Sequence, residues 1–261
     1  MHSLFSWIGG KSQDIKHIKP YFPKTINAYI EPFIGGGSVF FNLNHSQNIV
    51  NDNDADLINL YRHLANPDNE IFFKEKCQTY NNLSAIDRHK VFTYIIYILN
   101  NNYPYNIDRA ILFYIYKKMV YRGMMRYNRF GKYANYKINI TNGKLGKLKL
   151  RLSAIFYQLM KDTTIYNTDY KEIFDMGKMG DFVFIDPPYS TTMGYQTKFT
   201  KNDHIELADK FKSSIANVML VVNDIPLMRQ LYDGYIVGRY EKTYAVKPKT
   251  KEYILIINNY I

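Results

Sequence analysis

The chain has 261 residues, 46% of them hydrophobic and 16% aromatic, and its 34 Lys and Arg residues outnumber its 23 Asp and Glu residues to give a formal net charge of +11. This length is sufficient for one large core, or for a core domain that carries a smaller inserted one, which is the arrangement we expect. The sequence excludes a helical membrane-spanning protein, because no apolar run approaches the roughly 20 residues that a spanning helix needs. Its single cysteine, Cys77, excludes an internal disulfide and a multi-cysteine zinc site.

The excess positive charge lies in one segment. Between Arg109 and Lys161 there are 13 basic residues and no acidic residue, which leaves 21 of the 34 basic residues for the rest of the chain against all 23 acidic ones. The compositional bias of an AT-rich genome also makes proteins basic, but it would spread the charge more evenly. The segment therefore predicts contact with a nucleic acid.

The first half of the chain begins with a glycine-rich pattern. The run Trp7-Ile8-Gly9-Gly10-Lys11 combines an aromatic ring, two glycines and a cation, and by itself it fits any capped turn. A buried strand is predicted at 28–30, followed by the glycine-rich run from Glu31 to Ser38, which allows a tight turn and a close approach to a ligand. A second strand is predicted at 48–51, and Asp52 follows it, where an acid accepts hydrogen bonds from ribose hydroxyls.

This pattern predicts a nucleoside ligand. The glycine loop contains no Walker lysine, which disfavours a triphosphate. S-adenosylmethionine fits, because it has a ribose and no phosphate, and its sulfonium can lie beside an aromatic ring such as Phe33. A nicotinamide dinucleotide also fits the loop and Asp52, so an oxidoreductase is an alternative.

The middle of the chain, residues 57–161, gives helix signals. Ser84 and Asp87 resemble a capping box, and the residues from Asn106 to Tyr121 form a long amphipathic run rich in aromatic side chains. Gly, Asn and Lys crowd the part between Tyr127 and Lys149, which predicts loops that carry basic residues. We interpret this region as a basic helical insertion.

The strongest chemical signal is Asp186-Pro187-Pro188-Tyr189, directly after a strand predicted at 182–185. The exocyclic amine of adenine is a poor nucleophile because its lone pair is delocalised into the ring, so an enzyme must hold its two protons with two adjacent acceptors. The Asp186 carboxylate and the Pro187 carbonyl can be those acceptors on a backbone that the prolines stiffen, and Tyr189 offers a stacking face. A turn without catalytic function is the alternative for this motif.

The last part of the chain completes the predicted fold. Apolar runs at 218–222 and 253–257 indicate buried strands, and residues 202–211 have a helical pattern. Strands that alternate with helices are typical of an α/β fold with a mostly parallel sheet.

Taken in this order, the motifs resemble the Dam-type DNA adenine methyltransferases of bacteria and their phages, the D12 class (alpha group), over most of the chain. The resemblance implies site-specific transfer of a methyl group from S-adenosylmethionine to adenine N6 in double-stranded DNA, with base flipping. It implies a Rossmann-like core with a mostly parallel seven-stranded sheet in residues 1–56 and 162–261, and a helical DNA target-recognition domain in residues 57–161. No secretory signal is visible, so we expect the protein in the cytoplasm of a bacterium or of a virus-infected or phage-infected host cell. Neither a metal nor a membrane partner is expected, and a monomer is favoured.

The resemblance also assigns residues. The expected catalytic residues are Asp186, Pro187, Pro188 and Tyr189. The expected cofactor site comprises Trp7, Lys11, Phe33, Gly35, Gly36, Gly37, Ser38, Asp52, Asp169 and Asp186. The expected DNA-binding residues are Lys118, Tyr121, Arg122, Met124, Arg126, Asn128, Arg129 and Lys132.

Within the DNA-binding set, Arg126 matches the family's arginine that reads a guanine in G-A-T-C, which is the pairing that groove chemistry favours. A phosphate contact without base preference is the alternative for Arg126. Arg122 stands where the family has Asn, and the segment from Lys247 to Glu252 is shorter than usual, so the target sequence is left open.

Other functions compete with this interpretation. The motif around Asp186 also suits cytosine N4 or adenine in RNA, and a catalytically inactive DNA-binding relative would keep the basic segment. Tyr195 and Phe199 follow the catalytic motif, where they could close over a base or belong to hydrophobic packing.

Overall fold

The computed structural model describes residues 4–7, 9–101, 103–120, 123–134, 140–141, 144–145, 147–188, 199–244 and 247–260. Within these ranges, no helix is both long and apolar enough to cross a membrane.

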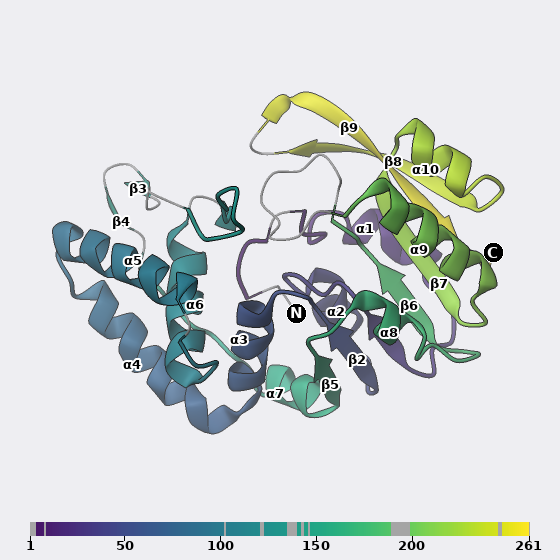
Figure 1. The fold of residues 1–261 in the computed structure, drawn as a ribbon. Coiled ribbons are helices and arrows are strands. Elements are labelled where there is room, and N and C mark those ends of the chain that lie inside the picture. The colour runs from purple at the N-terminus through teal and green to yellow at the C-terminus, as the bar shows by residue number, and fades with distance from the viewer. Residues whose placement is uncertain are drawn as a thin grey trace.

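A seven-stranded sheet forms the centre of the molecule, with the strand order β5-β2-β1-β6-β7-β9-β8 (Figure 1). The five strands from β5 to β7 are mutually parallel, whereas β9 is antiparallel to both β7 and β8. The strands are β1 (Tyr29–Glu31), β2 (Asn48–Asn51), β5 (Thr163–Tyr166), β6 (Phe182–Ile185), β7 (Asn217–Asn223), β8 (Ile236–Tyr244) and β9 (Lys247–Asn258). This sheet confirms the predicted Rossmann-like α/β fold.

Helices cover both faces of the sheet because successive strand residues point to opposite sides. In β6, Phe182 and Phe184 belong to one apolar cluster, and Val183 and Ile185 belong to another. The first cluster includes residues of α1 (Ile15–Ile18), α2 (Ser38–Leu43), α3 (Ala55–Ala65) and α7 (Ala154–Lys161). The second includes residues of α8 (Tyr170–Phe174), α9 (Lys201–Ser213) and α10 (Pro226–Leu231). A short 3-10 helix, η1 (Lys19–Tyr21), follows α1.

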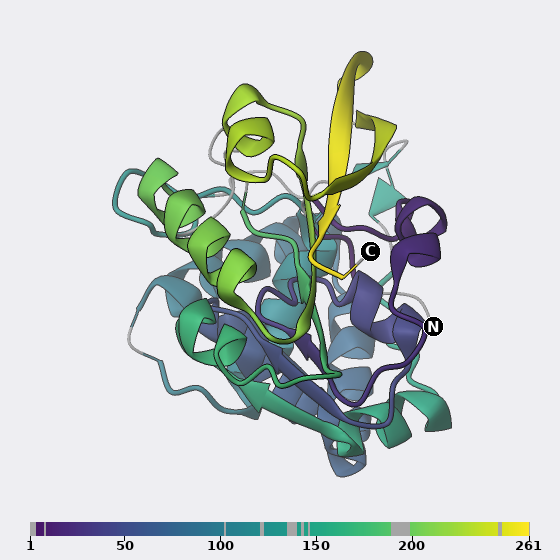
Figure 2. The same cartoon turned by 90° about the vertical axis from the view of Figure 1, so that its right-hand side faces the viewer.

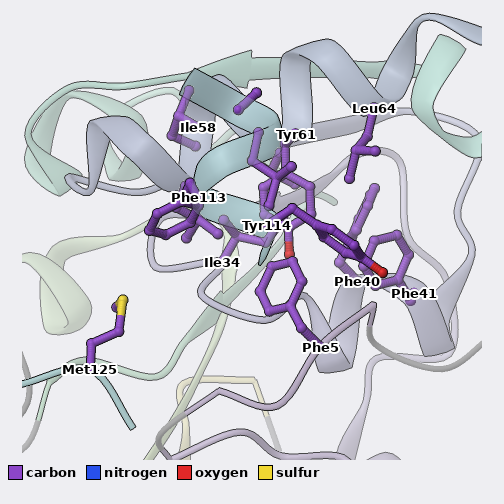
Figure 3. Packing of buried hydrophobic residues seen from close by; sticks show 14 of the residues in the cluster. Phe5, Ile34, Phe40, Phe41, Ile58, Tyr61, Leu64, Phe113, Tyr114 and Met125 are labelled. Carbon is purple, nitrogen blue, oxygen red and sulfur yellow. The ribbon is translucent and has the colours of Figure 1, made fainter. Parts of the chain in front are cut away.

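A helical region extends from one edge of the sheet (Figure 1). It contains η2 (Pro67–Asn69), α4 (Glu70–Asn81), α5 (Ala85–Asn100) and α6 (Ile107–Met119), followed by the small antiparallel pair β3 (Ile140–Thr141) and β4 (Lys144–Leu145). Figure 3 shows how closely it joins the core: Phe113 and Tyr114 of α6 lie in the same cluster as Tyr61 of α3 and Phe40 of α2. Helix α3 begins at Ala55, so the boundary predicted at residue 57 falls within its first turn.

Helix ends follow their capping residues. Ser84, the residue predicted to cap a helix, accepts a hydrogen bond from the Asp87 amide at the start of α5. Asn106 accepts one from the Arg109 amide at the start of α6, a cap that the sequence analysis did not predict. At α9, Thr200 and Asp203 form a reciprocal capping box.

The turned view in Figure 2 shows the hairpin of β8 and β9 rising above the rest of the sheet.

Candidate active site

A cavity of about 220 Å³ lies at the carboxyl ends of the parallel strands. Its walls come from the N-terminal segment and from the loops after β1, β2, β5 and β6. The chain runs from β1 outward to β2 and β5 on one side, while β6 and β7 lie on the other, so the strand order reverses beside β1. Ligands of open α/β sheets bind at this kind of switch point.

Lys11 and Asp186 form an ion pair on the cavity wall. Lys11 Nζ lies 2.5 Å from Asp186 Oδ1 and 2.6 Å from Oδ2, and it also donates to the Gly9 carbonyl at 3.0 Å. The lysine side chain is only 2% exposed, while that of Asp186 is 20% exposed. Burial lowers the pKa of Lys11 and raises the pKa of Asp186, and in both cases the partner's charge opposes the shift. The structure thus joins the N-terminal motif to the motif after β6, two segments 175 residues apart.

The glycine loop after β1 makes its close approach to side chains of the protein. A Cβ atom on Gly35 would lie 2.7 Å from Trp7 Nε1, one on Gly36 would lie 2.8 Å from Trp7 Cβ, and one on Gly37 would lie 2.6 Å from the Phe41 ring. Gly35 and Gly37 also have left-handed backbones, with φ of 47° and 67°. The glycines therefore allow Trp7 and Phe41 to pack on the loop, a reason that the sequence did not reveal.

Asp52 ties the glycine loop to the end of β2. One carboxylate oxygen accepts from the Gly35 amide at 2.9 Å, and the other accepts from the Asp54 amide at 3.0 Å. Burial raises the Asp52 pKa, and these two hydrogen bonds oppose that shift. The Asp52 carboxylate lines the cavity and can accept further hydrogen bonds there, since each of its oxygens can accept more than one.

Aromatic side chains form another wall of the cavity. Phe33 stacks on Tyr170 with ring centroids 5.0 Å apart, and Phe199 meets Phe33 edge-on at 5.8 Å. Phe199 is 9% exposed, which favours a packing role for it over that of a movable cover. Asp169 caps α8, where it accepts from the Lys171 amide at 2.9 Å, and it lies on the cavity rim.

The cavity is acidic although the chain is basic. Its lining contains six carboxylates (Glu31, Asp52, Asp54, Asp169, Asp186 and Asp203) and two lysines (Lys11 and Lys171). Burial raises the pKa of Glu31 well above its usual range, and it raises that of Asp54 to about 7. A cationic ligand would stabilise these carboxylates in their ionised form, whereas a phosphate-bearing ligand would meet repulsion.

We expect Gly35→Ala to destabilise the fold and to weaken binding at the cofactor site that the sequence predicts. A left-handed backbone costs an alanine about 1–2 kcal/mol, and the new methyl group also displaces Trp7 from the loop. Gly234→Ala is the matched control, because Gly234 has a φ of 80° and no atom within 4 Å of its added Cβ. The midpoint temperature of thermal unfolding should fall in both variants. Titration with S-adenosylhomocysteine should show a loss of affinity only in Gly35→Ala. Equal affinities would contradict the role given to the loop.

Five of the residues expected to bind DNA (Met124, Arg126, Asn128, Arg129 and Lys132) lie on a segment that is joined to the helical region by two hydrogen bonds between Tyr133 and Asn100 of α5. Asn128 accepts from the amides of Phe130 and Lys132, and Tyr127 pairs with Tyr133 in an antiparallel bridge. Arg126, Asn128, Arg129 and Lys132 are exposed, while Met124 is half-buried. Lys118 is also half-buried and donates to the Leu4 carbonyl at 2.6 Å.

Several predicted positions lie outside the described residues: Tyr121, Arg122, Tyr189 and Tyr195. Of the predicted cofactor residues, all but Gly37 line the cavity, and so does Pro188, whereas Pro187 is buried and is not among the lining residues.

The predicted site residues did not include several residues that line the cavity, among them Glu31, Tyr170, Met125 and Tyr127. Glu31 accepts from the Tyr29 hydroxyl at 2.8 Å, and Tyr170 belongs to the aromatic wall. Met125 and Tyr127 reach the cavity from the segment that carries Arg126. Only Glu31 had a visible signal, as an acid at the end of a buried strand.

Comparison with known proteins adds independent findings. A family model described as "D12 class N6 adenine-specific DNA methyltransferase" matches residues 7–249. The chain is 31% identical to the type II methyltransferase M.CviBI of Paramecium bursaria Chlorella virus NC1A, over 95% of this chain and 92% of the relative. It is 30% identical to the retron Ec67 DNA adenine methylase of Escherichia coli, over 90% of this chain and 82% of the relative. It is 29% identical to the type II methyltransferase M1.LlaDCHI of Lactococcus lactis subsp. cremoris, over 97% and 94%.

Proposed function

The chain belongs to the D12 class of N6 adenine-specific DNA methyltransferases, and from this premise we propose that it uses S-adenosylmethionine to methylate adenine within a short sequence of double-stranded DNA, with G-A-T-C as the first candidate. The observation that carries the proposal is the acidic cavity in which Lys11 and Asp186 meet beside the glycine loop. We also propose that the protein acts as a monomer and meets its DNA in the cytoplasm.

The residues that line the cavity fit S-adenosylmethionine by their chemistry. Asp52 has the free lone pairs that ribose hydroxyls need, and Phe33 and Tyr170 offer flat faces to an adenine ring or a sulfonium. Asp169 lies at the rim as an acceptor for the adenine amine, and the carboxylates suit the positive charges of the molecule. When bound there, it supplies an electrophilic methyl group.

Asp186 and Pro187 have the central chemical role in this proposal. Asp186 accepts one proton of the target amine, the Pro187 carbonyl accepts the other, and the lone pair is thereby localised on nitrogen. The ionised carboxylate also stabilises the positive charge that develops on that nitrogen. Lys11 holds Asp186 in place, and its positive charge opposes the rise in the Asp186 pKa that burial causes. Tyr189 is proposed to stack on the base.

We assign DNA recognition to residues 57–161 and the chemistry to residues 1–56 and 162–261. The exposed basic side chains of the middle region contact phosphates, which dominate affinity for DNA. Adenine N6 cannot reach a deep cavity from within the base stack, so the target nucleotide must be flipped out of the duplex. Tyr121, Arg122, Met124 and Asn128 complete the proposed contact surface.

We expect Arg126→Ala to reduce discrimination at one base pair by about 1–3 kcal/mol, because a bidentate arginine distinguishes guanine through O6 and N7. Lys132→Ala is the comparison, since removing a cation that meets only a phosphate should weaken binding to all sequences alike. The measurement is methylation rate on duplexes that carry each single-base change. A uniform loss of rate in Arg126→Ala would identify Arg126 as a residue that meets a phosphate rather than a base.

Two assays test the substrate. DNA treated with the protein and S-adenosylmethionine should become sensitive to an endonuclease that cuts only methylated G-A-T-C. If it stays resistant while methyl groups are incorporated, the target sequence is a different one. Parallel reactions with RNA, and analysis for N4-methylcytosine, separate the two alternative substrates, and a protein that binds DNA without methyl transfer would be the inactive relative.

A further inference from the structure

Lys117 of α6 is a buried lysine with contacts on two sides. Its side chain is 2% exposed, and its Nζ donates to the Gly123 carbonyl at 2.9 Å. The same Nζ lies over the ring of Trp7, 4.1 Å from the centroid, and 5.8 Å from the ring centre of Phe5. A cation at this distance from an indole face is attracted by the ring quadrupole.

The two contacts connect Lys117 to different regions: Trp7 packs on the glycine loop, and Gly123 belongs to the segment that carries Arg126. Trp7 packs on the cofactor loop so closely that neither Gly35 nor Gly36 has space for a Cβ atom. Gly123 begins the described part of the segment that carries Arg126, and Met125 of that segment lines the cavity. Lys117 therefore lies between the glycine loop and the segment that carries Arg126.

The N-terminal segment reinforces this connection. Gly123 has a left-handed backbone with a φ of 69°, and a Cβ there would lie 2.2 Å from the Ser6 carbonyl oxygen. Lys118, the next residue of α6, donates to the Leu4 carbonyl. Residues 4–7 are thus held between α6 and the glycine loop. A displacement of α6 would therefore displace the glycine loop, and the reverse.

The charge of Lys117 is unfavourable for the fold. Burial lowers its pKa to about 7, against an opposing effect of Asp54. A methionine would fill the same space without that penalty, because a buried cation must be compensated by its surroundings. A need to fill space in the core therefore does not explain why this residue is a lysine. The two contacts of its ammonium group, with the Gly123 carbonyl and the Trp7 ring, do explain it.

We propose that Lys117 is a positioning residue that couples the two binding sites, so that cofactor binding at the glycine loop and DNA binding by the segment from Gly123 strengthen each other. The inference rests on the proposed function. A bound cofactor fixes the glycine loop and with it Trp7, the fixed indole holds the ammonium, and the ammonium holds the Gly123 carbonyl. Thermodynamic linkage makes the effect equal in both directions.

The test uses Trp7 as its probe, because it is the only tryptophan of the protein. Its fluorescence gives the affinity for S-adenosylhomocysteine without DNA and with a saturating duplex that the wild-type protein methylates. We expect DNA to tighten this affinity at least about fivefold in the wild type, the lower end of usual allosteric coupling. In Lys117→Met the factor should fall below about two, and Lys117→Arg, which keeps the cation, should retain most of it.

The outcomes separate this inference from the proposed function. If Lys117 has only a structural role, Lys117→Met should change the affinity for S-adenosylhomocysteine by the same factor without and with DNA. The ratio of the two affinities would then keep its wild-type value, and this result would overturn the inference. If Lys117→Met does not fold, Lys117→Gln keeps a donor for Gly123 without the charge, and undiminished coupling in that variant is equally contrary. Wild-type protein that methylates DNA but shows no coupling refutes the inference alone, whereas wild-type protein without methyl transfer refutes the function on which it rests.

Discussion

Asp186→Ala is expected to reduce the rate of methyl transfer by about 10³-fold or more while DNA affinity stays nearly unchanged. Removal of one preorganised electrostatic group from an active site already costs about 10²–10³ in rate, and Asp186 is proposed both to orient the amine and to stabilise its charge. The variant also deprives buried Lys11 of its carboxylate partner. The rate is measured in single turnover, and DNA affinity by titration of a labelled duplex.

Asp186→Asn is the informative companion. It preserves the shape of the side chain and one acceptor oxygen but loses the charge, so it should remain nearly as slow as Asp186→Ala. If either variant methylates DNA at a rate close to the wild type, Asp186 does not have the role proposed for it. Intact binding of DNA without methyl transfer places the defect in the chemical step, because phosphate contacts supply most of the affinity.

Arg109→Met is expected to lower the free energy of unfolding by about 3–5 kcal/mol, the usual cost of breaking a buried ion pair from one side. Arg109 and Asp56 are both nearly inaccessible to solvent, with Nε 2.5 Å from Asp56 Oδ1. The guanidinium also donates to the carbonyls of residues 98, 99, 101 and 103, which close the turn between α5 and α6. Its removal leaves the Asp56 carboxylate buried, with the Tyr133 hydroxyl still donating to it.

The control for this variant is Lys90→Met, which breaks the exposed pair with Asp87 at 3.2 Å. Exposed pairs contribute about 0–1 kcal/mol, so this change should be small. Urea unfolding followed by circular dichroism measures both. Equal effects in the two variants would show that the Arg109 network does not hold α6 to α3.

How much of the fold was predictable depended on where each strand lies in the sheet. Central strands are buried on both faces, and the continuous apolar run at 182–185 marked β6 with correct bounds. The edge strands β5 and β8 gave no such run, because residues such as Thr163, Thr164 and Arg239 lie on partly exposed surfaces. Apolar runs marked five strands, and only the family resemblance implied the two others, which are β5 and β8.

The site was predictable where a residue type is tied to a chemical task. Asp186 and Asp52 each follow a strand, which places them at the same sheet edge as the glycine loop. The Lys11–Asp186 pair could not be derived from pattern alone, since nothing local relates positions so far apart. Lys117 entered the sequence analysis only as one of the 13 basic residues between Arg109 and Lys161, and tertiary packing showed that it is buried against Trp7.

The most direct test of the central claim is transfer of a labelled methyl group from S-adenosylmethionine to unmethylated DNA, followed by digestion to nucleosides and chromatography. The account predicts that the label appears as N6-methyladenine, and that it disappears when Asp186→Ala replaces the wild-type protein. Label on cytosine, label on RNA alone, or no incorporation by protein that binds the cofactor would contradict it.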